Sequence, residues 1–157
     1  MNAAGTVERS VVRSKGVFEF GNATLQTSWS WRRAVIRLGD REWTIHPTDR
    51  RRIGVEAYAG SGPAVRLHPQ RSHVPGPGGP VRWQRGHRGA RLERDGRSID
   101  VQIPPLARRP MRVEVTGDWP DLELVVLSMV YALMTKRRRR TIMIVAIIGA
   151  TGHGPVF

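Results

Sequence analysis

The sequence predicts a mainly β protein, in which an antiparallel β-barrel wraps around one buried hydrophobic helix near the C-terminal end. The first observation is that apolar and polar residues alternate in short segments between Val17 and Val115. Such alternation is typical of strands with one buried and one solvated face, which antiparallel sheets accept. The second observation is that residues 122–135 would be apolar on every side of a helix except at Ser128. A helix of this kind is buried all round, and a closed barrel provides that burial.

The predicted strands follow the alternation along the chain, and we expect about nine or ten of them. Their apolar positions are Leu25, Thr27 and Trp29; Trp43 and Ile45; Ile53, Val55 and Ala57; Val65 and Leu67; Val81 and Trp83; Ile99, Val101 and Ile103; and Met111, Val113 and Val115. The pairs Gly39-Asp40 and Asp95-Gly96 separate neighbouring segments and are hairpin signals, because they accept the positive φ of tight turns. Short strands at this spacing indicate a meander or barrel.

The rest of the chain divides around this barrel. Residues 1–16 are predicted to be a flexible N-terminus, and the barrel is expected over 17–137 with its central helix at about 121–136. Residues 68–80 hold prolines and glycines that forbid regular structure. They are interpreted as a surface excursion or a partly disordered lid, most simply a tolerated insertion. Residues 138–157 are an apolar tail, expected to form a last strand or to be disordered.

Length separates a buried helix from a membrane span. As a helix, Leu122 to Thr135 would be about 21 Å long at ~1.5 Å per residue, whereas a bilayer core is about 30 Å thick. Joining this run to the apolar residues after Arg140 would place four arginines in mid-span, at a cost on the order of 10 kcal/mol. The buried helix is therefore preferred. Asp118 or Asp121 is expected to cap it. A small membrane protein anchored by residues 122–149 stays open as an alternative.

The segment "VTGDWPDLELVVLSMVYALMTKR", residues 115–137, follows many short alternating strands. This combination resembles the tubby C-terminal-like superfamily, and within it the LURP-one-related (phospholipid scramblase-like) proteins, over residues 17–137. The resemblance implies a twelve-stranded barrel threaded by a hydrophobic C-terminal helix. It also implies binding of phosphoinositide headgroups by basic surface residues, as in tubby domains, or membrane association, as in scramblase-like relatives. No individual lipid-binding residue can be carried over.

The tail contains "MIVAIIGATGHG", residues 143–154, which resembles the opening strand and glycine-rich turn of NAD(P)-binding Rossmann domains. The following helix and the acidic residue about 20 positions on are missing, so no cofactor is predicted. A second hypothesis is that the tail is the beginning of a neighbouring reading frame that starts at Met143. We prefer a final strand that pairs with the barrel, because β-branched residues are frequent there: Ile142, Ile144, Val145, Ile147 and Ile148.

The composition is strongly basic, with a formal net charge of +13. All but two of the 26 basic residues are arginines, since Lys15 and Lys136 are the only lysines. Such a field attracts polyanions, which include anionic lipid headgroups and nucleic acids. Cysteine is absent, which excludes disulfides, thiolate catalysis and Cys-ligated metals. The N-terminal residues lack the apolar stretch of a signal peptide, so a cytoplasmic location, peripheral to the membrane, is expected.

Two basic clusters are the candidate sites for anionic lipid. The first consists of Lys136, Arg137, Arg138, Arg139 and Arg140, next to the apolar helix; the second consists of Arg50, Arg51 and Arg52, which Arg32 and Arg33 could join. Cations near an acidic membrane contribute about 1 kcal/mol each, although those at a helix C-terminus also complement its dipole. Tryptophans beside arginines could instead stack nucleic-acid bases. Core packing is preferred for Trp29 and Trp31, because they share a predicted strand face with Leu25.

No catalytic or metal-binding constellation stands out. The five histidines form no pair with metal-ligand spacing. The nearest carboxylate pairs, Asp40 with Glu42 and Asp95 with Asp100, flank hairpin turns, where acids are common for turn formation alone. We therefore expect a non-enzymatic, tubby-like binding module that associates with anionic phospholipid through its basic face. The alternatives are the membrane-anchored protein and a basic nucleic-acid-binding barrel.

Overall fold

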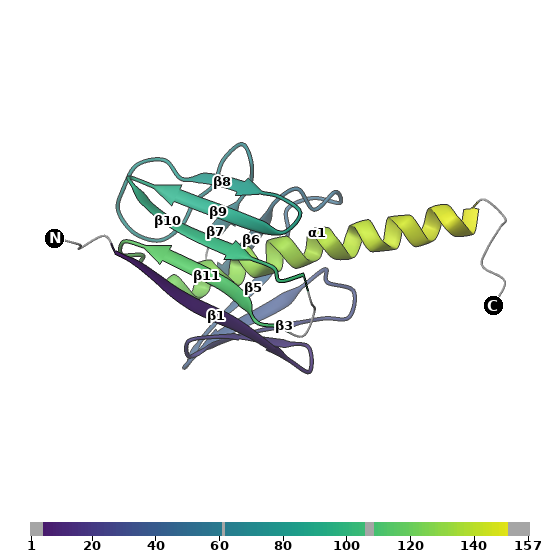
Figure 1. The fold of residues 1–157 in the computed structure, drawn as a ribbon, viewed down its shortest axis with the longest axis horizontal. Coiled ribbons are helices and arrows are strands. Elements are labelled where there is room, and N and C mark those ends of the chain that lie inside the picture. Colours follow the sequence, from purple (N-terminus) through teal and green to yellow (C-terminus); the bar gives the residue numbers. More distant parts are fainter. Residues whose placement is uncertain (1–4, 61, 106–108, 151–157) are drawn as a thin grey trace.

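The computed structural model describes residues 5–60, 62–105 and 109–150, with side chains up to Lys136. Eleven antiparallel strands form one sheet, which curves into a nearly closed barrel around a single helix (Figure 1). The predicted fold class, an antiparallel β-barrel around a buried hydrophobic C-terminal helix, is therefore confirmed. The elements are β1 (Thr6–Ser14), β2 (Val17–Phe20), β3 (Ala23–Thr27), β4 (Ala34–Leu38), β5 (Arg41–Pro47), β6 (Val55–Ala59), β7 (Gly62–Leu67), β8 (Arg82–Arg85), β9 (Gly89–Arg94), β10 (Arg97–Gln102), β11 (Met111–Thr116) and α1 (Leu122–Ala150).

The sheet is an up-and-down meander in which the first and last strands are also neighbours. Residues 6–11 of β1 pair with β11, and residues 12–14 pair with β2. The prediction of a flexible N-terminus over 1–16 is therefore wrong for the residues of β1. Only Val11 of this strand is buried, so its side chains show little alternation. The strand is held by backbone pairing with β11, more than a hundred positions away.

The two edges of the sheet, β7 and β8, are joined by the proline- and glycine-rich segment between them. The Arg66 and His73 backbones exchange two hydrogen bonds of 2.8 and 2.7 Å, and Ser72 forms a bridge with Val81. Val74 is completely buried in the core. Residues 68–80 lie at the surface except for Val74, but these contacts hold the segment in place, so the alternative of a partly disordered lid is wrong. The segment fills the gap between the two edge strands, and its His73 backbone supplies hydrogen-bond partners to Arg66 on the β7 edge.

The barrel interior is filled by α1 together with the inward-facing residues of the strands. The helix side chains from Leu124 to Leu133 are buried, including polar Ser128, whose hydroxyl donates to the Leu124 carbonyl at 2.7 Å. Apolar residues on all sides of α1 therefore face strands on all sides. At its start, the Asp121 carbonyl accepts the Val125 amide, while the Asp121 carboxylate is bound by Arg41. The predicted side-chain cap at Asp121 is thus replaced by an ion pair.

The helix continues beyond the barrel to Ala150 (Figure 1), past the predicted end near residue 136. The predicted final strand over 142–148 is wrong, and so is the Rossmann-like strand. A strand needs a neighbouring strand, whereas a helix pairs its own backbone. The glycine turn of the GATG motif reaches past the described residues. Residues 124–133 of the alternative 122–149 anchor lie inside the barrel. Among the described residues, no helix is long and apolar enough to cross a bilayer.

Candidate functional site

The two ends of the barrel carry turns of different composition. Neighbouring strands of this sheet are antiparallel, so the hairpin turns alternate between its two ends, except that the segment between β7 and β8 crosses from one end back to the other. We call the end where α1 leaves the barrel the exit end; its turns are residues 15–16, 28–33, 48–54, 68–71, 86–88 and the described parts of 103–110. We call the opposite end, where α1 begins, the start end; its turns are 21–22, 39–40, 60, 95–96 and 117–121. The contacts near the two ends of the buried part of α1 agree with this assignment. Arg41 binds Asp121 at the start end, and Arg52 binds Thr135 at the exit end.

Positively and negatively charged turn residues are distributed unequally between these two ends. The described cations of the exit-end turns are Lys15, Arg32, Arg33, Arg50, Arg51, Arg52, Arg71, Arg88 and Arg109. All of these except Arg52 are exposed, and the only acid among the same residues is Asp49. Within the described residues, the start-end turns hold acids and no cation: Asp40, Asp95, Asp118 and Asp121. The turns of the exit end are therefore mainly positive, and those of the start end are negative.

Ion pairs and hydrogen bonds increase the difference between the two ends. At the start end, Arg41 binds Asp121 at 2.9 Å and the Gly79 amide donates to Asp95 at 2.8 Å. At the exit end, Arg50 and Arg51 form no ion pair with any residue that the structure describes. The start-end acids are thus partly neutralised in place, whereas Arg50 and Arg51 are available to an anion from solution.

Two other arginines of the exit end fasten the turns to the helix. Arg85 donates to the Ala132 carbonyl at 3.0 Å and to the carbonyls of Arg52 and Ile53 at 3.0 and 3.1 Å. Burial lowers the pKa of the Arg85 guanidinium. Arg52 donates to the Thr135 hydroxyl at 3.1 Å and to the Ser30 carbonyl at 3.2 Å. Arg52, a predicted lipid-binding residue, therefore holds two turns against α1.

The turn between β3 and β4 contains two tryptophans with opposite environments. Trp31 is buried, stacks on Tyr131 at a centroid distance of 6.1 Å and meets Phe18 edge-on. Trp29 is 87% exposed. The prediction that both tryptophans pack in the core is therefore wrong for Trp29. The reason is that β3 ends at Thr27, so strand alternation does not extend to Trp29.

Tyr131 of α1 is bonded to this turn, and its ionisation is expected to make the free energy of unfolding depend on pH. Its hydroxyl donates to the Trp31 carbonyl at 2.5 Å, and burial raises its pKa to about 12. The unfolded chain releases this proton near pH 10, while the folded chain retains it to about pH 12. The free energy of unfolding should therefore fall between these pH values, by about 1.4 kcal/mol per unit from this group.

Denaturant titrations across this pH range compare the wild type with Tyr131→Phe. The Phe variant should lose less stability than the wild type as pH rises, because it has no phenolic proton. It should also be less stable below pH 10, where the hydrogen bond to Trp31 contributes about 1 kcal/mol. Parallel pH dependence in the two proteins would show that Tyr131 ionises freely in the folded state.

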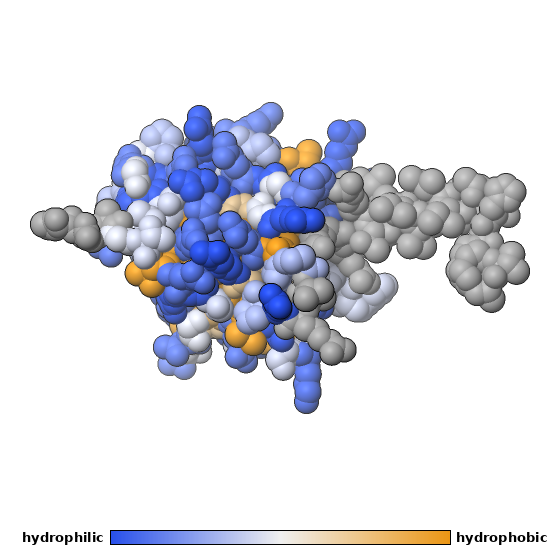
Figure 2. Space-filling view, in the orientation of Figure 1, coloured by the Kyte–Doolittle hydropathy of each residue, from blue (hydrophilic) through white to orange (hydrophobic). Residues whose placement is uncertain are grey.

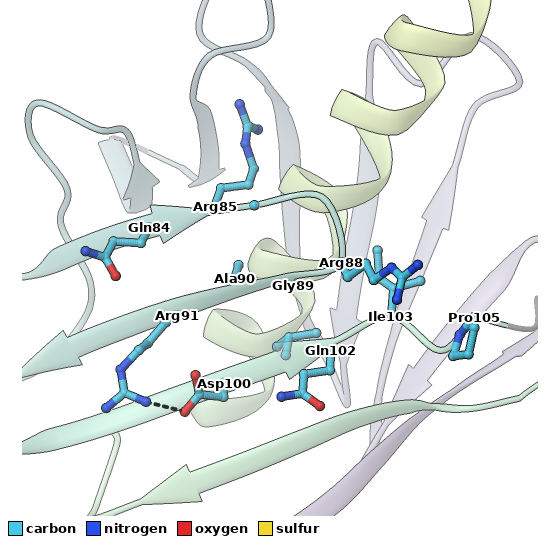
Figure 3. A pocket seen from close by; sticks show the side chains of 12 residues that line it. Gln84, Arg85, Arg88, Gly89, Ala90, Arg91, Asp100, Gln102, Ile103 and Pro105 are labelled. Atoms are coloured by element: carbon cyan, nitrogen blue, oxygen red, sulfur yellow. Dashed lines mark hydrogen bonds and ion pairs between the residues drawn. The ribbon is translucent and has the colours of Figure 1, made fainter.

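A hollow of about 710 Å³ lies on the outer wall near the exit end (Figure 3). Arg91 in this hollow is bound to Asp100 at 2.6 Å and also to Glu93. Figure 3 shows Arg91 directed toward Asp100, whereas Arg88 lies near Ile103 at the other side of the hollow. Gln84 and Gln102 add amide groups. The hollow therefore offers hydrogen bonds and the Arg88 cation, but its carboxylate is held by arginine.

The remaining wall is polar. In Figure 2, hydrophilic residues cover most of the visible face of the barrel, and apolar residues form scattered spots. In the described part of the chain, no group of three or more His, Cys, Asp or Glu side chains could hold a metal ion. The exit end thus differs from the wall in having a single acid, Asp49, among its described turn residues, together with one exposed tryptophan.

The structure brings some predicted site residues together and leaves others undescribed. Arg50 and Arg51 lie exposed in one exit-end turn, and Arg32 and Arg33 lie exposed in the neighbouring turn. Lys136 lies on α1 at the same end, while the side chains of Arg137, Arg138, Arg139 and Arg140 lie outside the described residues. Sequence reasoning missed Trp29, Arg88 and the grouping of turns by end. Counting strands would have identified the grouping for the turns before β7 but not for the later ones, because the segment between β7 and β8 crosses the barrel.

No protein-family model, curated protein or solved structure matches this chain. The resemblance to tubby-like and LURP-one-related proteins therefore stays a prediction.

Proposed function

We propose that this protein is a non-enzymatic binding module that docks its exit end on anionic phospholipid surfaces. The observation that carries the proposal is the distribution of charged turn residues, with exposed arginines at one end and acids at the other. A membrane with anionic lipids attracts cations near its surface by about 1 kcal/mol each. The same membrane repels acids, so the charge distribution favours a single orientation of the barrel.

The shape of the charged region supports a flat partner. Because α1 leaves the barrel at this end (Figure 1), the turns that can meet a surface together are neighbouring ones on one side of the helix, such as 28–33 and 48–54, which the Arg52–Ser30 hydrogen bond joins. No deep cleft is needed for this contact, and the hollow beside Arg88 lies on the wall. The resemblance to tubby-like proteins points in the same direction, because basic residues of tubby domains bind phosphoinositide headgroups.

Nucleic acid is the second candidate, favoured by the same positive field. Single-stranded nucleic acids are held by several aromatic platforms on which successive bases stack. Of the five tryptophans, Trp31, Trp43, Trp83 and Trp119 are buried and Trp29 is exposed. One exposed tryptophan offers a stacking position for a single base. The arrangement therefore supports a lipid surface better than a nucleic-acid strand.

Vesicle sedimentation with the full-length protein tests the proposal. We expect binding to vesicles of phosphatidylcholine and phosphatidylserine at low salt, weaker binding at high salt because ions screen exposed charges, and little binding to vesicles of phosphatidylcholine alone. A fluorescent single-stranded oligonucleotide is titrated in the same buffers. Tight oligonucleotide binding without vesicle binding would replace the lipid proposal with the nucleic-acid one, and equal binding to both vesicle types would contradict the electrostatic basis.

A further inference from the structure

Trp29 combines three properties that are rarely found together in a structural residue. Its side chain is 87% exposed, which leaves a large apolar surface in water. It lies in the exit-end turn 28–33, together with exposed Arg32 and Arg33. No aromatic stacking or cation–π contact to its ring is present among the described residues. Folding therefore gains little from this indole.

The backbone around Trp29 is nevertheless held firmly. The Ser28 amide donates to the Arg33 carbonyl at 3.1 Å and the Trp31 amide donates to the Ser28 carbonyl at 3.1 Å. Two residues after Trp29, Trp31 packs on Tyr131 of α1. The turn is thus anchored to the helix on one side of Trp29, and the indole is presented to solvent from a fixed backbone. A preorganised group binds without the entropic cost of ordering its loop.

Tryptophan has a specific preference that fits this position. Its ring is amphipathic, with an apolar body and one N–H donor, and it is enriched at the interface between water and bilayer. Arginines next to the ring would lie at the level of lipid phosphates while the ring lies slightly deeper. The exposed arginines of turn 28–33 and of the neighbouring turn provide these cations.

We infer that Trp29 is an interfacial membrane anchor, whose indole enters the headgroup region of an anionic bilayer when the exit end docks. The inference rests on the proposed function and adds an apolar component to its electrostatics. It also specifies orientation. Trp29 and the arginines belong to turns at one end of the barrel, so docking them brings this end to the membrane and turns the start end toward the solvent.

The test compares full-length wild type with Trp29→Ala on phosphatidylcholine–phosphatidylserine vesicles. We expect the variant to bind about tenfold more weakly, because partial burial of one large apolar ring is lost. Since apolar burial is not screened by salt, the ratio of the two affinities should be similar at low and moderate salt. Trp29→Phe should fall between them. The matched control is Val7→Ala, which removes apolar surface from a residue that is 57% exposed near the start end and should leave binding unchanged.

Fluorescence gives a second readout. Wild-type emission should shift to the blue on vesicle binding and be quenched by lipids brominated near the headgroup, and both effects should be absent in Trp29→Ala. If wild type binds but Trp29→Ala binds equally well, or no shift occurs, the anchor is refuted while the proposed function stands. If wild type does not bind anionic vesicles at low salt, the proposed function itself fails. Matching circular dichroism of both proteins ensures that the comparison concerns folded chains.

Discussion

Replacing Arg32, Arg33, Arg50 and Arg51 together with glutamine is expected to weaken binding to anionic vesicles by about a thousandfold. The estimate follows from about 1 kcal/mol for each cation near an acidic surface and a factor of ten for each 1.4 kcal/mol. The four side chains are exposed and belong to two neighbouring exit-end turns. Binding is measured by vesicle sedimentation at low salt, where screening is weakest.

A variant with the same change in net charge serves as the control. Arg37, Arg41, Arg82 and Arg91 lie on strands, outside the exit-end turns, and are replaced by glutamine in the same way. Because this variant retains the exit-end arginines, it should lose much less affinity. Equal losses in the two variants would mean that net charge alone, and no particular end of the barrel, governs binding. The replaced side chains in both variants are exposed or half-exposed, so the fold should tolerate the substitutions.

The second large effect concerns the central helix. Leu127→Ala is expected to lower the free energy of unfolding by about 3–5 kcal/mol, because truncating a buried leucine loses its transfer energy and leaves a cavity. Leu127 is fully buried among the barrel strands. Chemical denaturation followed by far-ultraviolet circular dichroism measures the change.

The neighbouring residue provides the control for this experiment. Ser128→Ala also alters a fully buried position of α1, but the Ser128 hydroxyl bonds to the Leu124 carbonyl within the same helix. Its removal leaves no partner from another element unsatisfied, so the free energy of unfolding should change by less than about 1 kcal/mol. If Leu127→Ala is as mild as Ser128→Ala, the helix is not tightly enclosed by the barrel.

Local patterns were sufficient for the barrel and its helix. Alternation in segments such as Ile99 to Ile103 reports which side chains are buried, and the unbroken apolar character of residues 122–135 requires burial on all sides. Both signals come from residues close together in sequence. The same signals did not predict β1, where only Val11 is buried. They also did not predict the pairing of residues 68–81, which involves backbone groups.

The site was predicted in part. The basic clusters near Arg50 and Arg32 follow from composition, and the structure places both at the exit end. Arg51 and Arg52 differ because of a contact between distant segments. Arg52 donates to Thr135 on the helix, whereas Arg51 is exposed. Trp29 and Trp31 likewise look alike in the sequence, and only packing against Tyr131 distinguishes them.

By itself, the sequence determined the fold class, the buried helix and the strongly positive charge, because hydrophobic period and composition are local properties. The tertiary structure alone decided how the gap between β7 and β8 is filled, the extension of α1 to Ala150, and the difference between arginines that fasten the helix and arginines that face solvent. It also decided that the turn charges collect at opposite ends. These features depend on hydrogen bonds and contacts between residues far apart along the chain, which no local pattern encodes.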